Sequence, residues 1–430
     1  MFRSVLSLFL FLVILQTTYA TDGYFRHGYG VKYSAIAGAG SALSLSSTGS
    51  ISNPAGIAFL NTGFDIDLSF FSPLRSYIVT GNPSGYPGTF PLTPGKYESS
   101  SELFLFPTIG ANFQLGEKFA IGLVGYGNGG MNTDYDFQVY HDPSSPETGV
   151  NIEQMFFGAA VAFEFVKGHS IGVSPLFGYQ RFSAKGLQSF GNFSKYPNFL
   201  SGNSVSTATG FGARVGYQGK LFPFLSLGGS FQTKISMSPF DEYKGLFAQE
   251  GDFDVPATWN AGLAIHPSEK FTLAFDVQQI LYSEVKSVAN KMDLTVNSPA
   301  LPNGSPNPNF QPLGSEEGWG FGWQDVMVIK GGLLFKPAPD WTLMAGYSQG
   351  KQPFDEKEVL FNILAPAVVE RHITVGFSKK FEDREMNISF MYAPTGTVEG
   401  KNIFEAPNQQ TIKLEMTQWQ LEFGYSFSSL

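Results

Sequence analysis

Residues 418–427 read QWQLEFGYSF and carry the clearest signal of fold class in the chain. Every second side chain, from Trp419 to Phe427, is aromatic or aliphatic, and those between them, from Gln418 to Ser426, are polar or small. Because successive strand side chains point to opposite faces, such a strand presents one face to lipid and the other to a polar interior. The same two-residue period recurs from about residue 64 onward. The pattern predicts a transmembrane β-barrel, an all-β fold.

The first twenty residues have the features of a secretory signal peptide. Arg3 precedes an apolar block from Val5 to Leu15, and small side chains at Thr18 and Ala20 close the segment. A membrane-spanning helix needs about 20 apolar residues, which is more than this block offers. We therefore expect cleavage after Ala20.

The composition excludes several classes of protein. The chain has 43 Phe, 18 Tyr and 49 Gly with only 15% charged residues, as expected when lipid-facing and lumen-facing positions average out. A net charge of −9 gives no sign of a nucleic-acid partner, and the lack of cysteine excludes disulfides and thiol chemistry. The alternative of a large secreted β-sandwich or β-helix should show a consistent short repeat, and we find none.

Alternating segments bounded by turn residues predict fourteen antiparallel strands. Short turns near residues 116–117, 167–168, 220–221, 267–269, 337–339 and 382–384 alternate strictly with seven long loops. Barrels of this kind place short turns in the periplasm and long loops outside. The predicted strands are 63–72, 103–115, 118–128, 154–166, 169–183, 207–219, 223–236, 257–267, 270–282, 325–336, 340–350, 370–381, 385–394 and 415–427.

Residues 21–62 do not alternate and are rich in small side chains. Asn53 is a good helix N-cap and Pro54 suits the first helical position, so we expect a short helix to begin there. A flexible tail would be more charged and less apolar. We therefore predict that 21–62 form a partly helical hatch inside the lumen of a barrel made by 63–430.

Three motifs resemble those of the FadL/TodX family of outer-membrane transporters for long-chain fatty acids and hydrocarbons. They are Gly38-Ala39-Gly40 with Asn53-Pro54-Ala55-Gly56, then Val255-Pro256-Ala257-Thr258-Trp259, then Pro366 to His372 leading into Ile373-Thr374-Val375-Gly376. The similarity runs over the whole mature chain. One departure is the Ser428-Ser429-Leu430 extension after the terminal aromatic residue Phe427.

The resemblance implies a monomeric fourteen-stranded barrel in the outer membrane of a Gram-negative bacterium, closed by the hatch. It implies passive uptake of a long-chain fatty acid or another hydrophobic small molecule, which leaves sideways through the wall into outer-membrane lipid. It also implies the barrel assembly machinery as a partner during biogenesis.

Catalytic and metal-binding patterns are lacking. The five histidines show no metal-ligand spacing, and no Gly-x-Ser-x-Gly motif occurs. We expect no enzyme, no cofactor and no metal. The alternatives are a structural or adhesive barrel and a barrel esterase, whose Ser, His and carboxylate would come from distant strands.

Isolated cations on the predicted lumen face suggest a site for an acidic head group. Lys330 lies on an otherwise apolar face with Val328 and Leu334, and Arg214 lies between Gly212 and Gly216. A lone cation among apolar side chains suits a carboxylate with a hydrocarbon tail. The alternative is that each cation is paired with a lumen carboxylate such as Asp276 or Glu164, because charges inside a membrane generally have partners.

Two long loops suggest where a hydrophobic compound enters. The loops at 184–206 and 237–256 are rich in aromatic and aliphatic residues, and we expect an exposed apolar uptake groove there. The alternative is that the loops pack on one another and on the rim of the barrel. These residues are Leu187, Phe190, Phe193, Phe199, Leu200, Phe240, Leu246 and Phe247.

The strand at 119–128 contains Gly122, Gly125 and Gly127, and glycine weakens strands and marks kinks. The resemblance implies the lateral exit at a kink in this strand. The alternative is that its glycines allow close packing against the hatch.

Overall fold

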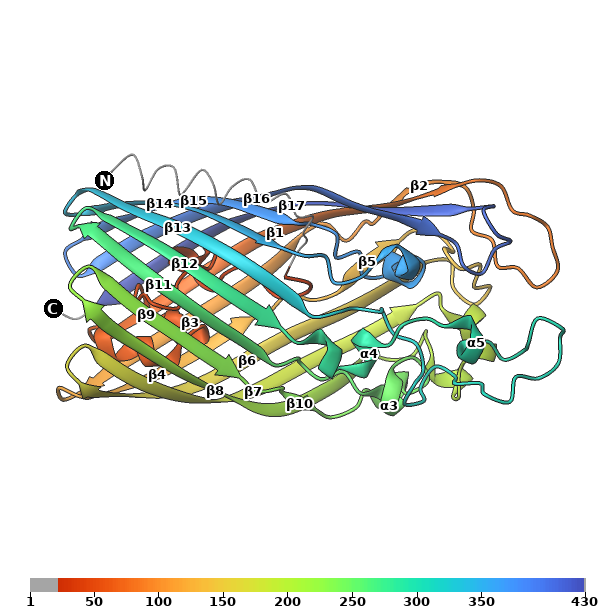
Figure 1. Ribbon diagram of the computed structural model, residues 1–430, viewed down its shortest axis with the longest axis horizontal. Helices are drawn as coiled ribbons and strands as arrows, with labels where there is room; N and C mark the ends of the chain where they lie inside the picture. Colours follow the sequence, from red (N-terminus) through yellow and green to blue (C-terminus); the bar gives the residue numbers. More distant parts are fainter. Residues whose placement is uncertain (1–21, 429–430) are drawn as a thin grey trace.

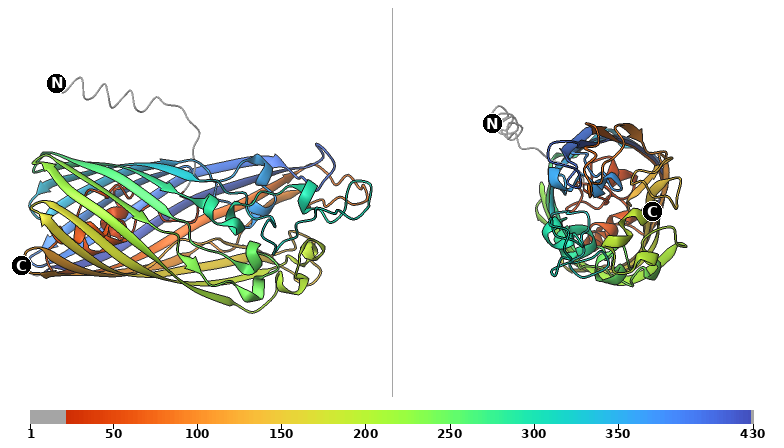
Figure 2. Two further views of the ribbon diagram at one scale, coloured as in Figure 1. Left: turned by 60° about the horizontal axis from the view of Figure 1, so that its bottom comes forward. Right: turned by 90° about the vertical axis from the view of Figure 1, so that its right-hand side faces the viewer.

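The computed structural model describes residues 22–428, so the predicted signal peptide lies outside the described residues. One antiparallel sheet closes into a barrel, because β1 (Gly63–Thr80) pairs with β17 (Thr411–Ser428) over its whole length. The view along the barrel axis in Figure 2 shows this ring of strands with the first described residues, drawn in red, inside it. No helix within residues 22–428 is long and apolar enough to cross a membrane.

Fourteen strands of eight or more residues form the wall, which confirms the predicted number. Besides β1 and β17 they are β3 (Phe104–Leu115), β4 (Phe119–Gly127), β6 (Thr148–Val166), β7 (His169–Lys185), β8 (Ser206–Phe222), β9 (Leu225–Gln232), β11 (Thr258–Ser268), β12 (Phe271–Ile280), β13 (Val326–Ala338), β14 (Trp341–Gly350), β15 (Arg371–Phe381) and β16 (Arg384–Lys401). The short strands β2 (Gly95–Glu98), β5 (Asn132–Tyr135) and β10 (Ser236–Met237) lie near the long loops.

The side chains alternate as the sequence predicts. In β17, Phe423 is 45% exposed, whereas its neighbour Glu422 is 1% exposed and faces the lumen. The short turns gather at one end of the barrel, here called the turn end, and the long loops gather at the other, the loop end (Figure 1). By the usual orientation of such barrels the loop end faces the exterior.

Several predicted strand limits are wrong at the loop end. β1, β6, β16 and β17 run up to eight residues further than predicted, because strands that leave the lipid no longer need one apolar face. The predicted strand 223–236 is interrupted between β9 and β10. Thr233 N donates to Ala213 O at 2.9 Å, and Ser236 already pairs with Phe211, so three residues oppose two in a β-bulge.

The hatch lies in the lumen near the turn end (Figure 1, red). Its helix begins at Pro54 as predicted, and Asn53 Oδ1 accepts from Ala55 N at 3.1 Å. All helices are short: α2 (Val31–Ser34), α3 (Ala248–Gly251), α4 (Lys286–Ala289), α5 (Leu294–Asn297), and the 3-10 helices η1 (Ser47–Ile51), η2 (Pro54–Phe59), η3 (Gln188–Phe193), η4 (Pro197–Phe199), η5 (Asp241–Tyr243), η6 (Tyr282–Glu284), η7 (Glu356–Glu358) and η8 (Phe361–Ile363).

Candidate functional site

Inward-facing glycines on the barrel wall let part of the hatch pack closely against it. On nine strands a glycine lies so close to the hatch that a Cβ atom there would fall within 3.0 Å of a hatch atom. The missing side chains let the hatch approach the wall directly, with its backbone at Gly110, Gly172, Gly228 and Gly346 and with side chains at the other five. This glycine belt consists of Gly110, Gly122, Gly172, Gly216, Gly228, Gly332, Gly346, Gly376 and Gly424.

Wall side chains also bind the hatch backbone. Asp276 Oδ2 accepts from Ser41 N at 2.8 Å, and Asp65 Oδ2 accepts from Ser47 N at 2.7 Å. The hatch motif at 53–56 lies against β7 and β8, where Asn53 Nδ2 donates to the carbonyl of Tyr217 at 2.9 Å. Residues Gly30–Leu60 are here called the hatch base. These hydrogen bonds give buried polar groups of the hatch base partners on the wall.

The hatch tip, residues Asp22–Tyr29, is held differently, by side chains. Lys330 Nζ donates to His27 O at 2.8 Å and lies 3.6 Å from Asp22 Oδ2. Arg26 forms a buried ion pair with Glu422. The rings of His27 and His372 are stacked with centroids 5.3 Å apart.

Lys330 is therefore engaged by the hatch in this conformation. The alternative that it has a carboxylate partner is confirmed, but the partner is Asp22. Asp276 binds Ser41 instead, and Glu164 accepts from Gly168 N in a turn. Sequence could not identify this partner because Asp22 lies some three hundred residues away along the chain. Of its predicted neighbours, Val328 is fully buried, and Leu334 packs in the cluster that contains Ala35 and Ile36 of the hatch base.

Arg214 differs from Lys330. It donates to the amide oxygen of Gln232, and no ion pair among residues 22–428 includes it. The side chain is only 7% exposed. It is thus a buried cation whose described contacts are neutral, which is the setting in which an anionic ligand would gain most.

The aromatic loops do not form the exposed groove that the sequence predicts. Phe190, Phe240 and Phe247 are each at most 4% exposed, and among the predicted groove residues only Phe199 is clearly exposed. Phe240 and Phe247 both pack on Phe182, at 5.5 and 4.7 Å between centroids. Phe193 packs on Trp319 at 5.4 Å. The alternative, that these loops pack on one another and on the rim of the barrel, describes the structure, because their apolar surface is removed from water in this way.

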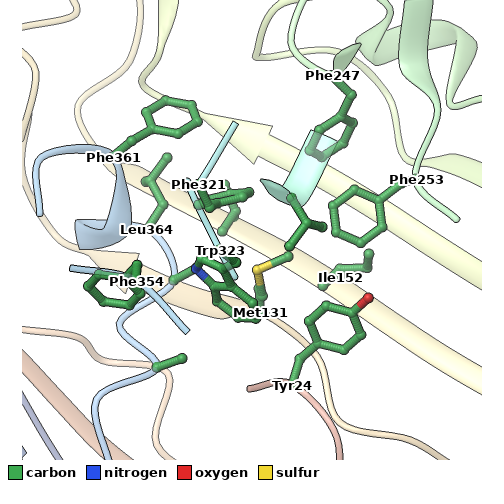
Figure 3. Packing of buried hydrophobic residues seen from close by; sticks show 14 of the residues in the cluster. Tyr24, Met131, Ile152, Phe247, Phe253, Phe321, Trp323, Phe354, Phe361 and Leu364 are labelled. Carbon is green, nitrogen blue, oxygen red and sulfur yellow. The ribbon is translucent and has the colours of Figure 1, made fainter. Parts of the chain in front are cut away.

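A continuous series of rings extends this packing inward from the loop end. Phe193 contacts Trp319, which lies 6.4 Å from Phe361; Phe361 lies 5.2 Å from Phe321. Phe321 lies 6.3 Å from Trp323, which lies 5.8 Å from Tyr24 of the hatch tip. We call these six residues the lumen ring series: Phe193, Trp319, Phe361, Phe321, Trp323 and Tyr24. Figure 3 displays its inner members with Met131 in one cluster.

Most residues of this series were not predicted from the sequence. Residues 318–323 read GWGFGW, with an aromatic residue at every second position in a loop. That pattern was the available signal. The indole of Trp323 donates to Asn362 Oδ1 at 2.8 Å, and Asn362 donates to the carbonyl of Phe321 at 2.7 Å, so the 318–323 segment is tied to the loop at 351–370.

The wall has a gap beside β4. Backbone pairing of β3 with β4 ends at Thr108 and Tyr126, and the next backbone bond between these stretches is Ser100 N to Asp134 O at 2.8 Å. Between them, β4 ends at Gly127 and the chain resumes as β5. The connecting residues Asn128–Met131 turn toward the lumen, where Gly129 abuts the backbone of Tyr24.

The predicted glycines flank this wall gap but do not make the break. Gly122 belongs to the glycine belt, as its alternative interpretation predicts, with a would-be Cβ 2.9 Å from Ile57. Gly125 faces Ile109 and Phe157, and Gly127 faces Phe106. The break itself falls at Asn128-Gly129-Gly130-Met131.

Comparison with known sequences identifies one family. The profile of the family described as outer membrane protein transport protein (OMPP1/FadL/TodX) matches residues 27–418. No curated protein matches the chain.

Solved structures share the fold at low sequence identity. The toluene transporter TodX of Pseudomonas putida has a TM-score of 0.68 at 17% identity, with 94% of this chain and 99% of that chain covered. A FadL homologue of Pseudomonas aeruginosa has a TM-score of 0.64 at 14% identity, covering 96% and 100%. The toluene transporter TbuX of Ralstonia pickettii has a TM-score of 0.62 at 14% identity, covering 94% and 99%.

Proposed function

The chain belongs to the OMPP1/FadL/TodX family of outer-membrane proteins that transport hydrophobic compounds, and from this premise we propose a route and a cargo class. Cargo enters at the loop end, passes along the lumen ring series, and leaves through the wall gap into the membrane. No energy source is required, because the compound moves down its own gradient.

The lumen ring series is the observation that carries this proposal. Its members make ring contacts from the half-buried Phe193 at the loop end to Tyr24, whose backbone lies against Gly129 at the wall gap. Aromatic side chains offer large apolar faces that a hydrophobic compound can replace without exposing them to water. Because the rings touch one another here, cargo advances by displacing one ring after another.

The membrane side of the wall gap is also suited to an apolar compound. A groove of about 580 Å³ runs over the lipid-facing wall beside it, lined by Ile109, Leu123, Gly125, Phe157, Phe177 and Phe211. A compound released there stays out of water, which favours an alkyl chain by roughly 0.8 kcal/mol for each CH₂.

We propose small aromatic hydrocarbons as the preferred cargo. A flat ring can stack on each member of the series in turn, at the offset or edge-on geometries that aromatic pairs favour. The structural relatives TodX and TbuX are toluene transporters, which supports this choice.

Long-chain fatty acids, the cargo predicted from sequence, are the second candidate. Arg214 favours them, because it is a buried cation without a carboxylate partner among the described residues. A charge-assisted bond to a fatty acid carboxylate would satisfy it.

The test is uptake into proteoliposomes of toluene, dodecane and laurate. We expect toluene to enter fastest, and Trp323→Ala, which interrupts the ring series, to slow toluene severalfold; Trp259→Ala, on the barrel wall outside the series, serves as control. Uptake of toluene unchanged by Trp323→Ala would overturn the route. Faster entry of laurate, lost in Arg214→Gln while dodecane is unaffected, would establish the second candidate instead. Absence of uptake for all three would indicate a structural barrel.

A further inference from the structure

Phe106 of β3 lies within the wall gap. Its ring is half-buried, and its Cδ1 atom is 3.0 Å from where a Cβ of Gly127 would stand. The ring of Phe71, on β1, lies 6.0 Å away on the other side. Phe106 has the strand parity of the inward residues Thr108 and Gly110, and its ring contacts Gly127, which is itself buried. The ring therefore lies between two strands that have separated.

The backbone around Phe106 explains the separation. The next residue is Pro107, which has no N–H to donate and is found in sheets at strand edges. On the opposite side Gly127, Gly129 and Gly130 offer no side chain to cover the opening. Strand pairing joins no residue of 101–107 with one of 127–133 within the part of the chain that the structure describes. A side chain that fills this space separates the open strand edges from lipid, which cannot satisfy their backbone groups.

The hatch tip holds this side chain. The Arg26 guanidinium carbon lies 5.4 Å from the centroid of the Phe106 ring and 5.7 Å from that of Tyr29. Arg26 is itself held by its ion pair with Glu422 of β17 and by a 3.4 Å hydrogen bond to Thr108 Oγ1 of β3. A cation above a ring face attracts it, most strongly away from water. Phe106 is thus fixed from the lumen side by the same segment that contains Tyr24, the last member of the ring series.

We propose that Phe106 is the gate of the wall gap and that Arg26 of the hatch tip positions it in the closed state. The proposal rests on the lateral release proposed above. Cargo that reaches Tyr24 and Tyr29 competes for the face of Phe106, and the ring swings away from Gly127 to let it pass. The gate thereby selects for compounds that can pack against an aromatic face and pass edge-on through the gap.

The absence of cysteine makes a direct test available. The Cβ of Phe106 lies 3.7 Å from the would-be Cβ of Gly127, close to the separation of about 3.8 Å in disulfides. The double variant Phe106→Cys/Gly127→Cys can therefore bridge the gap with the only thiols in the chain. The control is Gly229→Cys/Ala261→Cys, a directly opposed, lipid-facing pair in a fully bonded part of the wall with a Cβ separation of 3.9 Å.

The results distinguish the role of Phe106 as a gate from lateral release through the wall gap. Oxidised Phe106→Cys/Gly127→Cys is expected to lose toluene uptake and to regain it on reduction, while the control pair is indifferent to redox state. Phe106→Ala is expected to raise uptake roughly fivefold, because it removes one ring–ring contact and one cation–ring contact that hold the gate closed. Phe113→Ala, nearer the turn end of the same strand, is expected to leave uptake unchanged. Uptake that persists after oxidation would overturn lateral release itself. Loss on oxidation with no gain in Phe106→Ala would keep the exit and overturn the gate.

Discussion

The hatch base and the hatch tip are parts of one segment that meet the same wall by different means. The base, Gly30–Leu60, packs its backbone and side chains directly against the glycine belt. The tip, Asp22–Tyr29, meets the wall through the side chains of Lys330, Glu422 and His372. A wall position without a side chain has no rotamer with which to adjust to its neighbour, whereas a side-chain pair can separate and re-form. The base is therefore the fixed part of the lumen and the tip is the part that can move with cargo.

The largest effect is expected from filling the belt. In Gly346→Val the new side chain would overlap the backbone of Ile36, so the hatch base and wall could not both keep their positions. We expect a loss of more than about 4 kcal/mol, or failure to assemble, seen as loss of the compact band in cold dodecyl sulfate gels. Gly331→Val is the matched control on the neighbouring strand, because its Cβ would meet nothing nearer than 3.9 Å. Equal assembly of the two variants would mean that the base is not rigidly seated.

A smaller but substantial effect is expected at the tip. Arg26→Gln leaves Glu422 buried without its cation, which costs about 3–5 kcal/mol. The double variant Arg26→Gln/Glu422→Gln removes both charges and should regain much of that loss. Urea unfolding of the assembled protein measures both. If the double variant were no more stable than the single one, the ion pair would not be what holds the tip.

The smallest effect is expected at Lys330. Lys330→Met removes the bond to the His27 carbonyl and the charge beside Asp22, at a cost of about 1–3 kcal/mol confined to the tip. Hydrogen exchange should accelerate for the amides of residues 24–29 and stay slow in the hatch base. Lys336→Met, an exposed lysine on the same strand, should change neither. Acceleration throughout the hatch would show that base and tip move as one unit.

Lipid explains which parts of this structure were predictable from sequence. Because lipid demands one apolar face, residues 418–427 and their counterparts reveal strands, their number and their orientation. Asn53 and Pro54 mark a helix start through local bonding alone. Beyond the lipid that demand ends, and the predicted limits of β1, β6, β16 and β17 were too short for this reason.

The candidate site was less accessible because it depends on contacts between distant residues. Nothing in the order of residues tells that Lys330 meets Asp22, or that Phe190 is covered by Trp319 rather than by water. Gly125 and Gly127 lie on the strand that ends at the wall gap, but the break itself lies one to four residues beyond Gly127, where Gly129 meets Tyr24. Phe106 looked like one more strand phenylalanine, since only the separation of its neighbours gives it a distinct position.

The glycine belt also constrains the order of events in biogenesis. A hatch base that packs closely against glycines on nine strands leaves little clearance through which it could slide after the ring of strands is complete. The seam between β1 and β17 joins the first and last strands of the wall, so it can form only after β17 has been synthesised. The hatch base precedes β1 in the chain and must already be collapsed when that seam forms. It then serves as the core around which the wall is wound, and a chain without it would have to close over a hollow lined with bare glycine backbone.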